Sequence, residues 1–343
     1  MNFCKQLDSL NVNYDICTLG KNSNKFMKVL NYLWFYINTF IKCLLGNYDL
    51  IYVHYPSMSA QPVLMAKKLR NFSLISNVHG TDVIPLKLTH QKMEKYTAAA
   101  IQASSKVVVP SEYYAHLISD TYNKSKADIL VYPSGGVNPD VFYQVSDEAR
   151  ESYRLKFGIN PDKMVIGFVG RIFKAKGWDI FLDALEIINN AGRYDYEVLM
   201  VGSGEDDEEC AERIEALPKN LKKSIHRFPL LPQEDLAKAY NAIDIFVFPT
   251  TSKSESLGLV AIEAMACGIP VIASDYAAPA YYVNDGVNGY KFEMGNKVAL
   301  AEKIEKYCRD SDATRQSMKE KSLETSYEYR TDKISNTLRT IFE

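Results

Sequence analysis

The stretch MVIGFVGRIFKAKGWDIF, residues 164–181, contains the local pattern that decides the fold. It begins with an apolar, β-branched run at 164–169, continues through a loop bounded by Gly170 and Gly177, and leads into a helical pattern over residues 178–191. An apolar strand that is buried on both faces and followed by a helix is typical of a parallel sheet. This stretch therefore predicts one strand–loop–helix unit of an α/β protein.

The same alternation of strand-like and helical patterns recurs on both sides of this stretch. The other strand-like runs are residues 14–19, 49–55, 74–80, 106–111, 128–135, 196–202, 243–250 and 269–275. Nine strands exceed one compact sheet, and 343 residues are enough for two domains. We therefore predict two Rossmann-like domains, residues 1–150 and 151–326, followed by a C-terminal helix at 327–343.

Composition and charge exclude several classes of protein. The chain is 47% apolar and 24% charged, which fits a globular protein and excludes a disordered or collagen-like one. Its net charge of −2 gives no indication of nucleic acid as a partner. The six cysteines form no C-x-x-C pair and have no histidine cluster beside them, so neither a disulfide framework nor a metal site is expected. This cysteine usage and a polar start without a signal peptide favour the cytoplasm.

The beginning of the sequence departs from the pattern of a Rossmann domain. Such a domain opens with a strand, a Gly-rich turn and a helix, and this first strand lies in the middle of the sheet. Here residues 1–10 are typical of the end of a helix, and the first strand-like run is already residues 14–19. We therefore expect that about one strand–turn–helix is missing from the start, and that the first domain is incomplete there.

Two cations lie in the loop that follows the strand at 164–169. Arg171 and Lys176 are five residues apart between two glycines, at the carboxyl end of a strand, where open α/β sheets bind their ligands. An arginine can hold a phosphate through two parallel hydrogen bonds, and a lysine acts as a point charge. The loop therefore suits a diphosphate, although a solvated basic loop would have the same composition.

A second segment with binding chemistry is SESLGLVAIEAMACGIPV, residues 254–271. Gly258 is expected to open a helix and Gly268 to close it. The free backbone N–H groups of Leu257, Gly258 and Leu259 would then form the kind of helix terminus that binds anions.

Two glutamates accompany this helix start. Glu255 precedes it, and Glu263 lies about one turn inside the helix. A carboxylate beside a phosphate site can accept hydrogen bonds from hydroxyl groups, which sugars and ribose carry in number. The structural alternatives are an ordinary helical glutamate for Glu263 and a partner of the helix dipole for Glu255.

Together these segments resemble the retaining GT-B glycosyltransferases of the family-4 type. Glu255 and Glu263 have the family's E-x7-E spacing, and AMACGIPV follows as in its AMA-x-G-x-PV signature. The loop at 170–177 matches the upstream GR-x4-KG element, and NDGVNGYKF at 284–292 matches the hairpin after the last core strand. The resemblance is specific over residues 164–293 and looser over residues 50–140. It also implies that the C-terminal helix at 327–343 crosses back to the first domain.

The resemblance implies an α/β protein of the GT-B class, with two facing Rossmann-like domains and a cleft between them. It implies retaining transfer of a hexose-type sugar from a nucleotide-diphosphate donor, of UDP or GDP type, to a hydroxyl acceptor. The acceptor would be a glycan or a lipid-linked molecule, as in bacterial surface polysaccharide or glycolipid assembly. Neither a cofactor besides the donor substrate nor a metal is implied.

The family's donor-binding roles carry over to matching residues of this sequence. Arg171 and Lys176 would bind the donor diphosphate, and Glu255 the hydroxyl groups of the donor sugar. Glu263 would hold the ribose hydroxyl groups. The implied donor-binding residues are Gly170, Arg171, Lys176, Glu255, Leu257, Gly258, Leu259 and Glu263.

In the first domain the resemblance implies a catalytic histidine. His79 matches the family histidine that faces the donor sugar, so His79, Glu255, Arg171 and Lys176 form the predicted catalytic set. Asp82, Ser111 and Glu112 are acceptor-side candidates. His54, also at the end of a strand-like run, is interpreted as structural.

A basic and aromatic stretch at residues 21–42 has two interpretations. We favour packing of Leu33, Trp34, Phe35 and Ile37 inside the first domain. The lysines of the stretch would still be attracted to anionic lipid, by about 1 kcal/mol each near the surface. The protein would then make peripheral contact with the inner face of the cell membrane.

Two other functions stay open on the sequence alone. A non-catalytic GT-B subunit or scaffold is compatible with the incomplete first domain. A nucleotide-sugar 2-epimerase would use the same fold, although the E-x7-E and AMA-x-G-x-PV elements argue against it.

Overall fold

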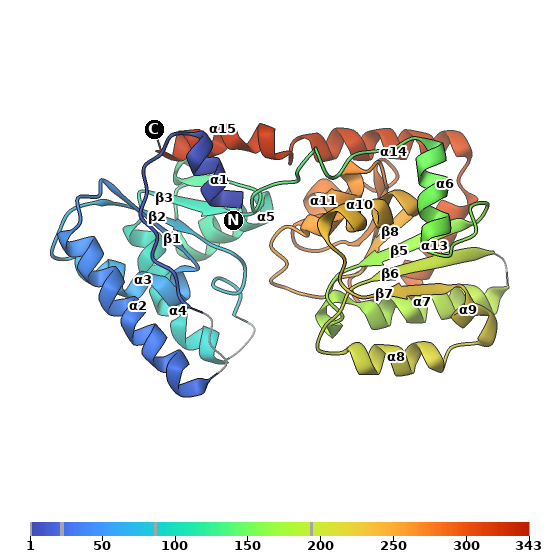
Figure 1. Ribbon diagram of the computed structural model, residues 1–343, viewed down its shortest axis with the longest axis horizontal. Coiled ribbons are helices and arrows are strands. Elements are labelled where there is room, and N and C mark those ends of the chain that lie inside the picture. The colour runs from blue at the N-terminus through green and yellow to red at the C-terminus, as the bar shows by residue number, and fades with distance from the viewer. Residues whose placement is uncertain (1, 21–23, 86–87, 193–194, 343) are drawn as a thin grey trace. The chain divides into compact units, whose positions relative to one another are not determined.

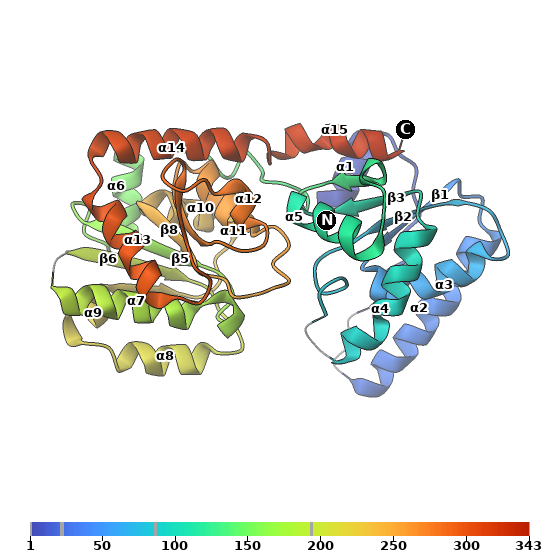
Figure 2. The ribbon, with the colours of Figure 1, turned by 180° about the vertical axis from the view of Figure 1, so that it is seen from behind.

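The computed structural model describes residues 2–20, 24–85, 88–192 and 195–342. The chain divides into two compact units. The first unit comprises Met1–Gly135 together with Ser335–Glu343, and the second unit comprises Gly136–Ile334. Figures 1 and 2 show the helices and strands of each unit from opposite sides.

The first unit is built on a four-stranded parallel sheet. The strands β1 (Leu50–His54), β2 (Ser73–Asn77), β3 (Lys106–Val109) and β4 (Ile129–Val131) lie side by side in chain order. Parallel neighbours require a crossover between them, and helices supply it. The helices are α1 (Asn2–Ser9), α2 (Lys25–Leu45), α3 (Pro56–Lys67), α4 (Leu88–Ala103) and α5 (Glu112–Tyr122), with α15 (Thr331–Phe342) mostly in this unit.

The core of the first unit consists of two clusters of apolar side chains. One cluster joins β1 and β2 to α3, with Val53, Val63 and Leu74 buried. The other joins β3 to α5, with Val107 and Ile118 buried. Strand β1 is at the edge of the sheet, with β2 on its only paired side among the described residues (Figure 1).

The second unit is built on a six-stranded parallel sheet in the order β10-β9-β8-β5-β6-β7. Its strands are β5 (Met164–Val169), β6 (Tyr196–Val201), β7 (Ile225–Phe228), β8 (Ile245–Phe248), β9 (Val271–Ser274) and β10 (Gly289–Phe292). Strand β5 has β6 on one side and β8 on the other, so the strand order reverses there. In open α/β sheets, ligands bind outside the carboxyl ends of the strands at such a switch point.

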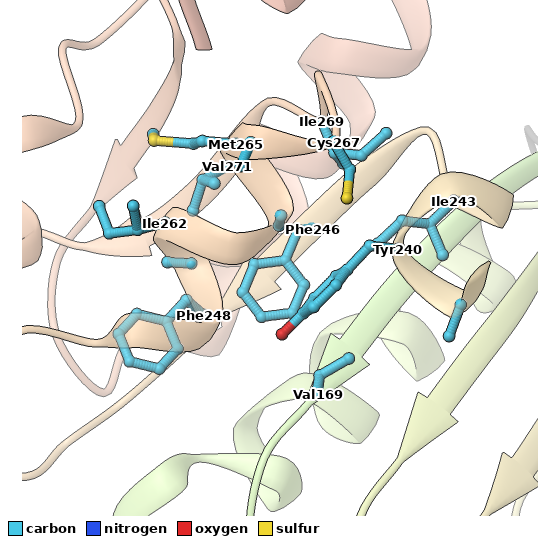
Figure 3. Packing of buried hydrophobic residues seen from close by; sticks show 14 of the residues in the cluster. Val169, Tyr240, Ile243, Phe246, Phe248, Ile262, Met265, Cys267, Ile269 and Val271 are labelled. Carbon is cyan, nitrogen blue, oxygen red and sulfur yellow. The ribbon is translucent and has the colours of Figure 1, made fainter. Parts of the chain in front are cut away.

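Helices cover both faces of this sheet. They are α6 (Asp147–Lys156), α7 (Trp178–Ala191), α8 (Asp207–Glu215), α9 (Lys219–Lys223), α10 (Gln233–Ala242), α11 (Leu259–Ala266), α12 (Pro279–Tyr282), α13 (Lys297–Arg309) and α14 (Asp312–Tyr327). Helices α10 and α11 pack on one face, where Tyr240, Phe246 and Ile262 meet (Figure 3). Helices α7 and α13 pack on the other face around Phe181 and Ile304.

The boundary predicted at residues 150 and 151 is wrong, because it falls inside α6. Arg150 and Arg154 of this helix hold the partly buried carboxylate of Asp244 at 2.5 and 2.6 Å, directly before β8. Burial alone would raise the pKa of Asp244, but the two guanidinium charges outweigh burial and lower it. Because both arginines hold the second sheet, α6 belongs to the second unit, and the division lies earlier, after Gly135.

The C-terminal helix predicted at 327–343 corresponds to α15, which spans Thr331–Phe342. Helix α14 ends at Tyr327 and α15 begins at Thr331. Between them, the backbone of Val137 pairs with this junction, accepting from Thr331 and donating to Tyr329. Residues from Ser335 onward belong to the first unit.

The strands differ from the sequence-based predictions at three further places. Residues 14–19 form neither strand nor helix, because no described strand lies beside them to supply a hydrogen-bonding ladder. Strand β7 was not predicted. The stretch at 284–292, expected to form a hairpin after the last core strand, is instead a turn that leads into β10, which pairs in parallel with β9.

The predicted interior packing of Leu33, Trp34 and Ile37 is wrong. These side chains are 56%, 68% and 45% exposed on α2, whereas Phe35 is partly buried. They belong to a row of exposed apolar residues spaced mostly by three or four positions, which we name the α2 stripe. The α2 stripe consists of Phe26, Val29, Leu30, Leu33, Trp34, Ile37, Ile41 and Leu45. Lys21, the start of the basic stretch, lies outside the described residues.

Candidate functional site

The loop after β5 places two cations at the switch point of the second sheet. Arg171 follows the strand by two residues and is exposed, with its guanidinium 5.7 Å from the ring of Phe173. Lys176 closes a short 3₁₀ turn before Gly177. Gly177 has φ +74°, and a Cβ there would lie 2.0 Å from the carbonyl oxygen of Pro249. Only glycine therefore allows the loops after β5 and β8 to approach this closely.

Lys176, in the loop after β5, and Glu255, in the loop after β8, form an ion pair that joins the two loops. The Nζ of Lys176 lies 2.6 Å from Oε2 of Glu255, and the two side chains are 24% and 8% exposed. Oε2 also lies 3.1 Å from the hydroxyl group of Thr250. No described residue donates a hydrogen bond to the other oxygen, Oε1. One carboxylate oxygen of a well-anchored, buried glutamate is therefore available to a hydroxyl group.

The start of α11 lies two to four residues beyond Glu255. Gly258 caps this helix in the left-handed region, with φ +76°, and a Cβ there would lie 2.6 Å from the ring of Phe248. The backbone N–H groups of Leu257, Gly258 and Leu259 donate no hydrogen bond to any residue that the structure describes. The helix terminus thus offers unused donors together with the positive end of the helix dipole.

Glu263 lies further along α11 and is buried, with 6% exposure. The hydroxyl group of Tyr240 donates to its Oε2 over 3.1 Å. Burial raises the pKa of Glu263 to about 7, and the hydrogen bond from Tyr240 opposes this rise only partly. At neutral pH this carboxyl group is therefore poised between its neutral and charged forms.

The structure brings together most of the predicted donor-binding residues. Lys176, Glu255 and the start of α11 share one location, and Gly170 and Arg171 come from the neighbouring strand end, since β5 and β8 are adjacent. No described side chain forms an ion pair with Arg171. The guanidinium is consequently available to an external anion at this edge of the sheet.

The edge of the first unit has a different chemistry. His79 follows β2, and its Nε2 lies 2.9 Å from Nδ1 of His54 at the end of β1. The ring of His79 also stacks on Tyr55, with 4.1 Å between centroids. Burial lowers the pKa of His54 to about 4 and, with some help from His54, that of His79 to about 3. Both rings are therefore uncharged at neutral pH.

The other candidates of the first unit follow strands at the same edge of its sheet. Asp82 is buried, and its carboxylate accepts from the backbone N–H of His79 at 2.9 and 3.2 Å. Burial raises the pKa of Asp82 to about 6, against hydrogen bonds from the backbone. Ser111 is the buried N-cap of α5, and Glu112 is exposed in its first turn. They follow β3, the neighbour of β2.

Three contributors to these sites escaped sequence reasoning. Thr250 donates a hydrogen bond to Glu255. Its position at the end of a predicted strand could have identified it as a candidate site residue. Tyr240 reaches Glu263 from a different helix, and no local pattern reveals this pairing. His54 was interpreted as structural, whereas it contacts the predicted catalytic histidine directly.

Two searches of the described residues gave negative results. No group of three or more histidine, cysteine, aspartate or glutamate side chains in them could hold a metal ion. None of their helices combines the length and the apolar character needed to cross a membrane.

Comparison with protein families gives two adjacent matches. The profile described as Glycosyl transferases group 1 matches residues 149–325, more than half of the chain. The profile described as Glycosyltransferase Family 4 matches residues 3–141. The two matches lie largely in the second and first units, respectively.

Individual relatives agree with these matches. The D-inositol 3-phosphate glycosyltransferase of Rhodococcus erythropolis is 32% identical over 255 residues, which cover 71% of this chain and 56% of that protein. The chain spans about half the length of such curated relatives, between 41% and 56%.

Solved structures share the fold. Sucrose-phosphate synthase from Thermosynechococcus elongatus superposes with a TM-score of 0.77 at 23% identity, covering 95% of this chain and 81% of that one. HepE from Anabaena, in complex with UDP, gives a TM-score of 0.76 at 19% identity, covering 99% and 88%. These likenesses confirm the predicted α/β fold of the GT-B class, with two Rossmann-like domains.

Proposed function

The chain belongs to the glycosyl transferases group 1 family, and from this premise we propose that it transfers a sugar from a nucleoside-diphosphate sugar to a hydroxyl acceptor, with retention of anomeric configuration. The observation that carries the proposal is the convergence of Lys176, Glu255 and the unused N–H groups at the start of α11. Together these groups offer cationic and N–H donors for phosphate and a carboxylate oxygen for sugar hydroxyl groups.

The donor diphosphate is assigned to the loop after β5 and the start of α11. Arg171 is exposed and outside any ion pair among the described side chains, so it can bind a phosphate through two parallel N–H groups. Lys176 is a point charge that Glu255 already holds in place. The N–H groups of Leu257, Gly258 and Leu259 would hold the distal phosphate.

The sugar and the ribose are assigned to the two glutamates. The Oε1 atom of Glu255 is the proposed acceptor of donor-sugar hydroxyl groups, because its other oxygen is held by Lys176 and Thr250. Glu263 would accept from ribose hydroxyl groups. HepE, of the same fold, has been solved with UDP and with UDP-glucose. A uridine donor is therefore the first to test, with a guanosine donor as the alternative.

The proposed reaction develops negative charge on the leaving group. The bond between the anomeric carbon and the phosphate oxygen breaks, and its electron pair goes to the departing diphosphate. The acceptor hydroxyl oxygen attacks from the same face, and its proton passes to the departing phosphate oxygen. Arg171, Lys176 and the helix terminus stabilise the growing charge in fixed positions. Since these groups supply the positive charge, we propose that the enzyme works without a metal.

The first unit would provide the acceptor side. The uncharged ring of His79 can donate a hydrogen bond to a sugar hydroxyl group, or accept one from it, without introducing charge. The carboxylate of Asp82 holds His79 in place by accepting a hydrogen bond from its backbone N–H. Ser111 and Glu112, at the neighbouring strand end, are the further candidates for contacts to the acceptor.

The α2 stripe supports a lipid-linked acceptor and contact with the inner face of an anionic membrane. Helix α2 has 21 residues, none of them acidic, and includes Lys28 and Lys42. An exposed row of apolar side chains with Trp34 among them, on a helix of purely basic charge, is typical of an interfacial helix. We propose that the enzyme acts in the cytoplasm, in the assembly of a bacterial surface polysaccharide or glycolipid.

Vesicle binding tests this placement. The double variant Leu33→Ser/Trp34→Ser should bind phosphatidylglycerol vesicles at least tenfold more weakly than the wild type, and the exposed control Leu230→Ser should match the wild type. Unchanged vesicle binding by the double variant would contradict the proposal that the α2 stripe contacts the membrane.

A turnover assay tests the function itself. The protein should release UDP from UDP-glucose, or GDP from a GDP-hexose, only when a hydroxyl acceptor is present, and chelation with EDTA should leave the rate unchanged. NMR of the product should show the anomeric configuration of the donor. Arg171→Ala should lower the rate at least tenfold, and the exposed control Arg309→Ala should not. An inverted product, or isomerised free donor without acceptor, would contradict the proposal.

A further inference from the structure

Glu255 places a buried negative charge beside the cation that is assigned to the donor diphosphate. Its Oε2 atom lies 2.6 Å from the Nζ of Lys176, and the side chain of Glu255 is only 8% exposed. At this distance the carboxylate cancels much of the positive charge of the ammonium group. A diphosphate that enters the site would therefore compete with Glu255 for this lysine.

Thr250 holds Glu255 in place independently of Lys176. The threonine is 2% exposed, and its hydroxyl oxygen lies 3.1 Å from Oε2 of Glu255 and 3.1 Å from the carbonyl oxygen of Ala175. A hydroxyl group has one hydrogen to donate. The backbone N–H of Thr251 already donates to Ala175 over 2.9 Å, and a carboxylate is the stronger acceptor. The hydroxyl hydrogen of Thr250 is therefore assigned to Glu255, whose carboxylate stays in place if Lys176 turns toward a phosphate.

The donor and the nucleotide product of the proposed reaction differ in charge. In a nucleoside-diphosphate sugar each phosphate is linked on two sides and carries one negative charge. Departure of the sugar leaves a terminal phosphate whose second ionisation has a pKa of about 6. At neutral pH most of the product therefore carries one more negative charge than the donor. This charge appears on the phosphate that held the sugar, the part of the ligand that is assigned to the surroundings of Glu255.

Glu255 would consequently affect the two ligands in opposite directions. With the intact donor, its Oε1 atom would accept hydrogen bonds from sugar hydroxyl groups, and these bonds would offset its repulsion of the diphosphate. With the product the hydroxyl groups are gone and the like charges remain. Because Glu255 is buried, solvent and salt screen this repulsion less than they would at the surface. The single ammonium group of Lys176 cannot neutralise both anions.

We propose that Glu255 has a second role: its charge weakens binding of the free nucleoside diphosphate, so that the site favours the intact donor and releases the product. This role rests on the proposed function, because it requires the diphosphate to bind at Lys176. It predicts that removal of a charged residue from the binding site makes the bare nucleotide bind more tightly. Removal of a residue that served only to bind the ligand or to support the site would weaken binding instead.

Calorimetric titration of the full chain with UDP and with GDP tests the proposal. Glu255→Gln keeps the size of the side chain and a hydrogen-bond acceptor but removes the charge. We expect it to bind the nucleotide at least fivefold more tightly than the wild type. Glu255→Ala, which removes the same charge, should also bind more tightly and gives a second measurement if the glutamine variant does not fold.

The matched control is Glu209→Gln. Glu209 pairs with Lys174, which lies in the same loop as Lys176, but this pair is at the surface, with exposures of 53% and 57%. The control variant should bind the nucleotide as the wild type does. An equal gain in the control would overturn the proposal, since the effect would then come from the charge of the whole protein.

Product inhibition gives the same comparison during turnover. The inhibition constant of added UDP or GDP should fall at least fivefold in Glu255→Gln, even though transfer itself becomes slower. Unchanged or weaker nucleotide binding by both Glu255 variants, beside clear binding by the wild type, would overturn this inference and leave the proposed function standing. Absence of nucleotide binding by the wild type would overturn the proposed function, and this inference with it.

Discussion

The loop edges of the two units occupy the same place in a parallel sheet but carry opposite kinds of chemistry. In the second unit, Lys176 and Glu255 are charged and paired, Arg171 is exposed, and a helix terminus offers free donors. In the first unit, His54 and His79 are uncharged rings in contact with each other. The fold places a candidate site at each edge, and the side chains decide whether an anion or a neutral hydroxyl group would suit it.

Burial explains how the two edges remain different at one pH. At the second unit, the ammonium group of Lys176 and the carboxylate of Glu255 lie 2.6 Å apart as an ion pair. Among the described residues of the first unit, no carboxylate pairs with the rings of His54 and His79, because the carboxylate of Asp82 contacts the backbone of His79 rather than its ring. Charge stabilisation is therefore expected from the second unit, and neutral hydrogen bonding from the first.

The largest effect should follow removal of a paired cation from the second edge. Lys176→Ala should lower sugar transfer at least a hundredfold, because it removes a phosphate ligand and leaves the buried Glu255 without its partner. Lys174→Ala is the matched control, since Lys174 lies in the same loop but pairs with Glu209 on the surface. The measurement is the initial rate of UDP or GDP release. If both variants lost activity to a similar extent, the loss would come from a general disturbance of the loop and not from removal of the ion pair.

A smaller effect should appear in the pH dependence of stability through Glu263. Its pKa of about 7 in the folded state is above the value of 4.5 for an exposed glutamate. The folded state therefore loses stability as pH rises from 4.5 through 7, by about 1–3 kcal/mol. Glu263→Gln removes this loss, so urea unfolding should show the variant gaining on the wild type between pH 5 and pH 8. An equal difference at both pH values would contradict the assignment.

The first edge should show the opposite dependence on pH. The folded-state pKa values of His54 and His79, about 4 and 3, lie below the value of 6.5 for an exposed histidine. Their neutral forms contribute stability above pH 6.5 that is lost as pH falls toward 4. Besides each other, these rings face Tyr55, Tyr52 and Phe3.

The variant His54→Phe tests this dependence. It keeps an aromatic ring beside Phe3 and Tyr52 but removes one titrating group, so its unfolding free energy should fall less steeply between pH 6.5 and pH 4. If the unfolding free energies of the variant and the wild type, measured by urea unfolding, fell equally steeply with pH, the lowered pKa of His54 would be contradicted.

The sequence was informative wherever structure depends on neighbours along the chain. The strand, glycine-bounded loop and helix at 164–191 are local, and they placed Lys176 correctly at the switch point. Residues 14–19 have the composition of a strand, but a strand also requires a partner, which no local pattern supplies. The contacts between His54 and His79 and between Tyr240 and Glu263 join distant segments, so composition and spacing did not reveal them. The domain boundary failed for the same reason, because the pairing of Arg150 with Asp244 is a distant contact.

The most direct measurement of the central claim is calorimetric titration of the protein with UDP, GDP and ADP. The account predicts that UDP or GDP binds with a dissociation constant in the micromolar range, and that Arg171→Ala/Lys176→Ala weakens it at least a hundredfold while His79→Ala has little effect. Absence of binding by all three nucleotides, or unchanged binding by the double variant, would contradict the assignment of the diphosphate to the second unit.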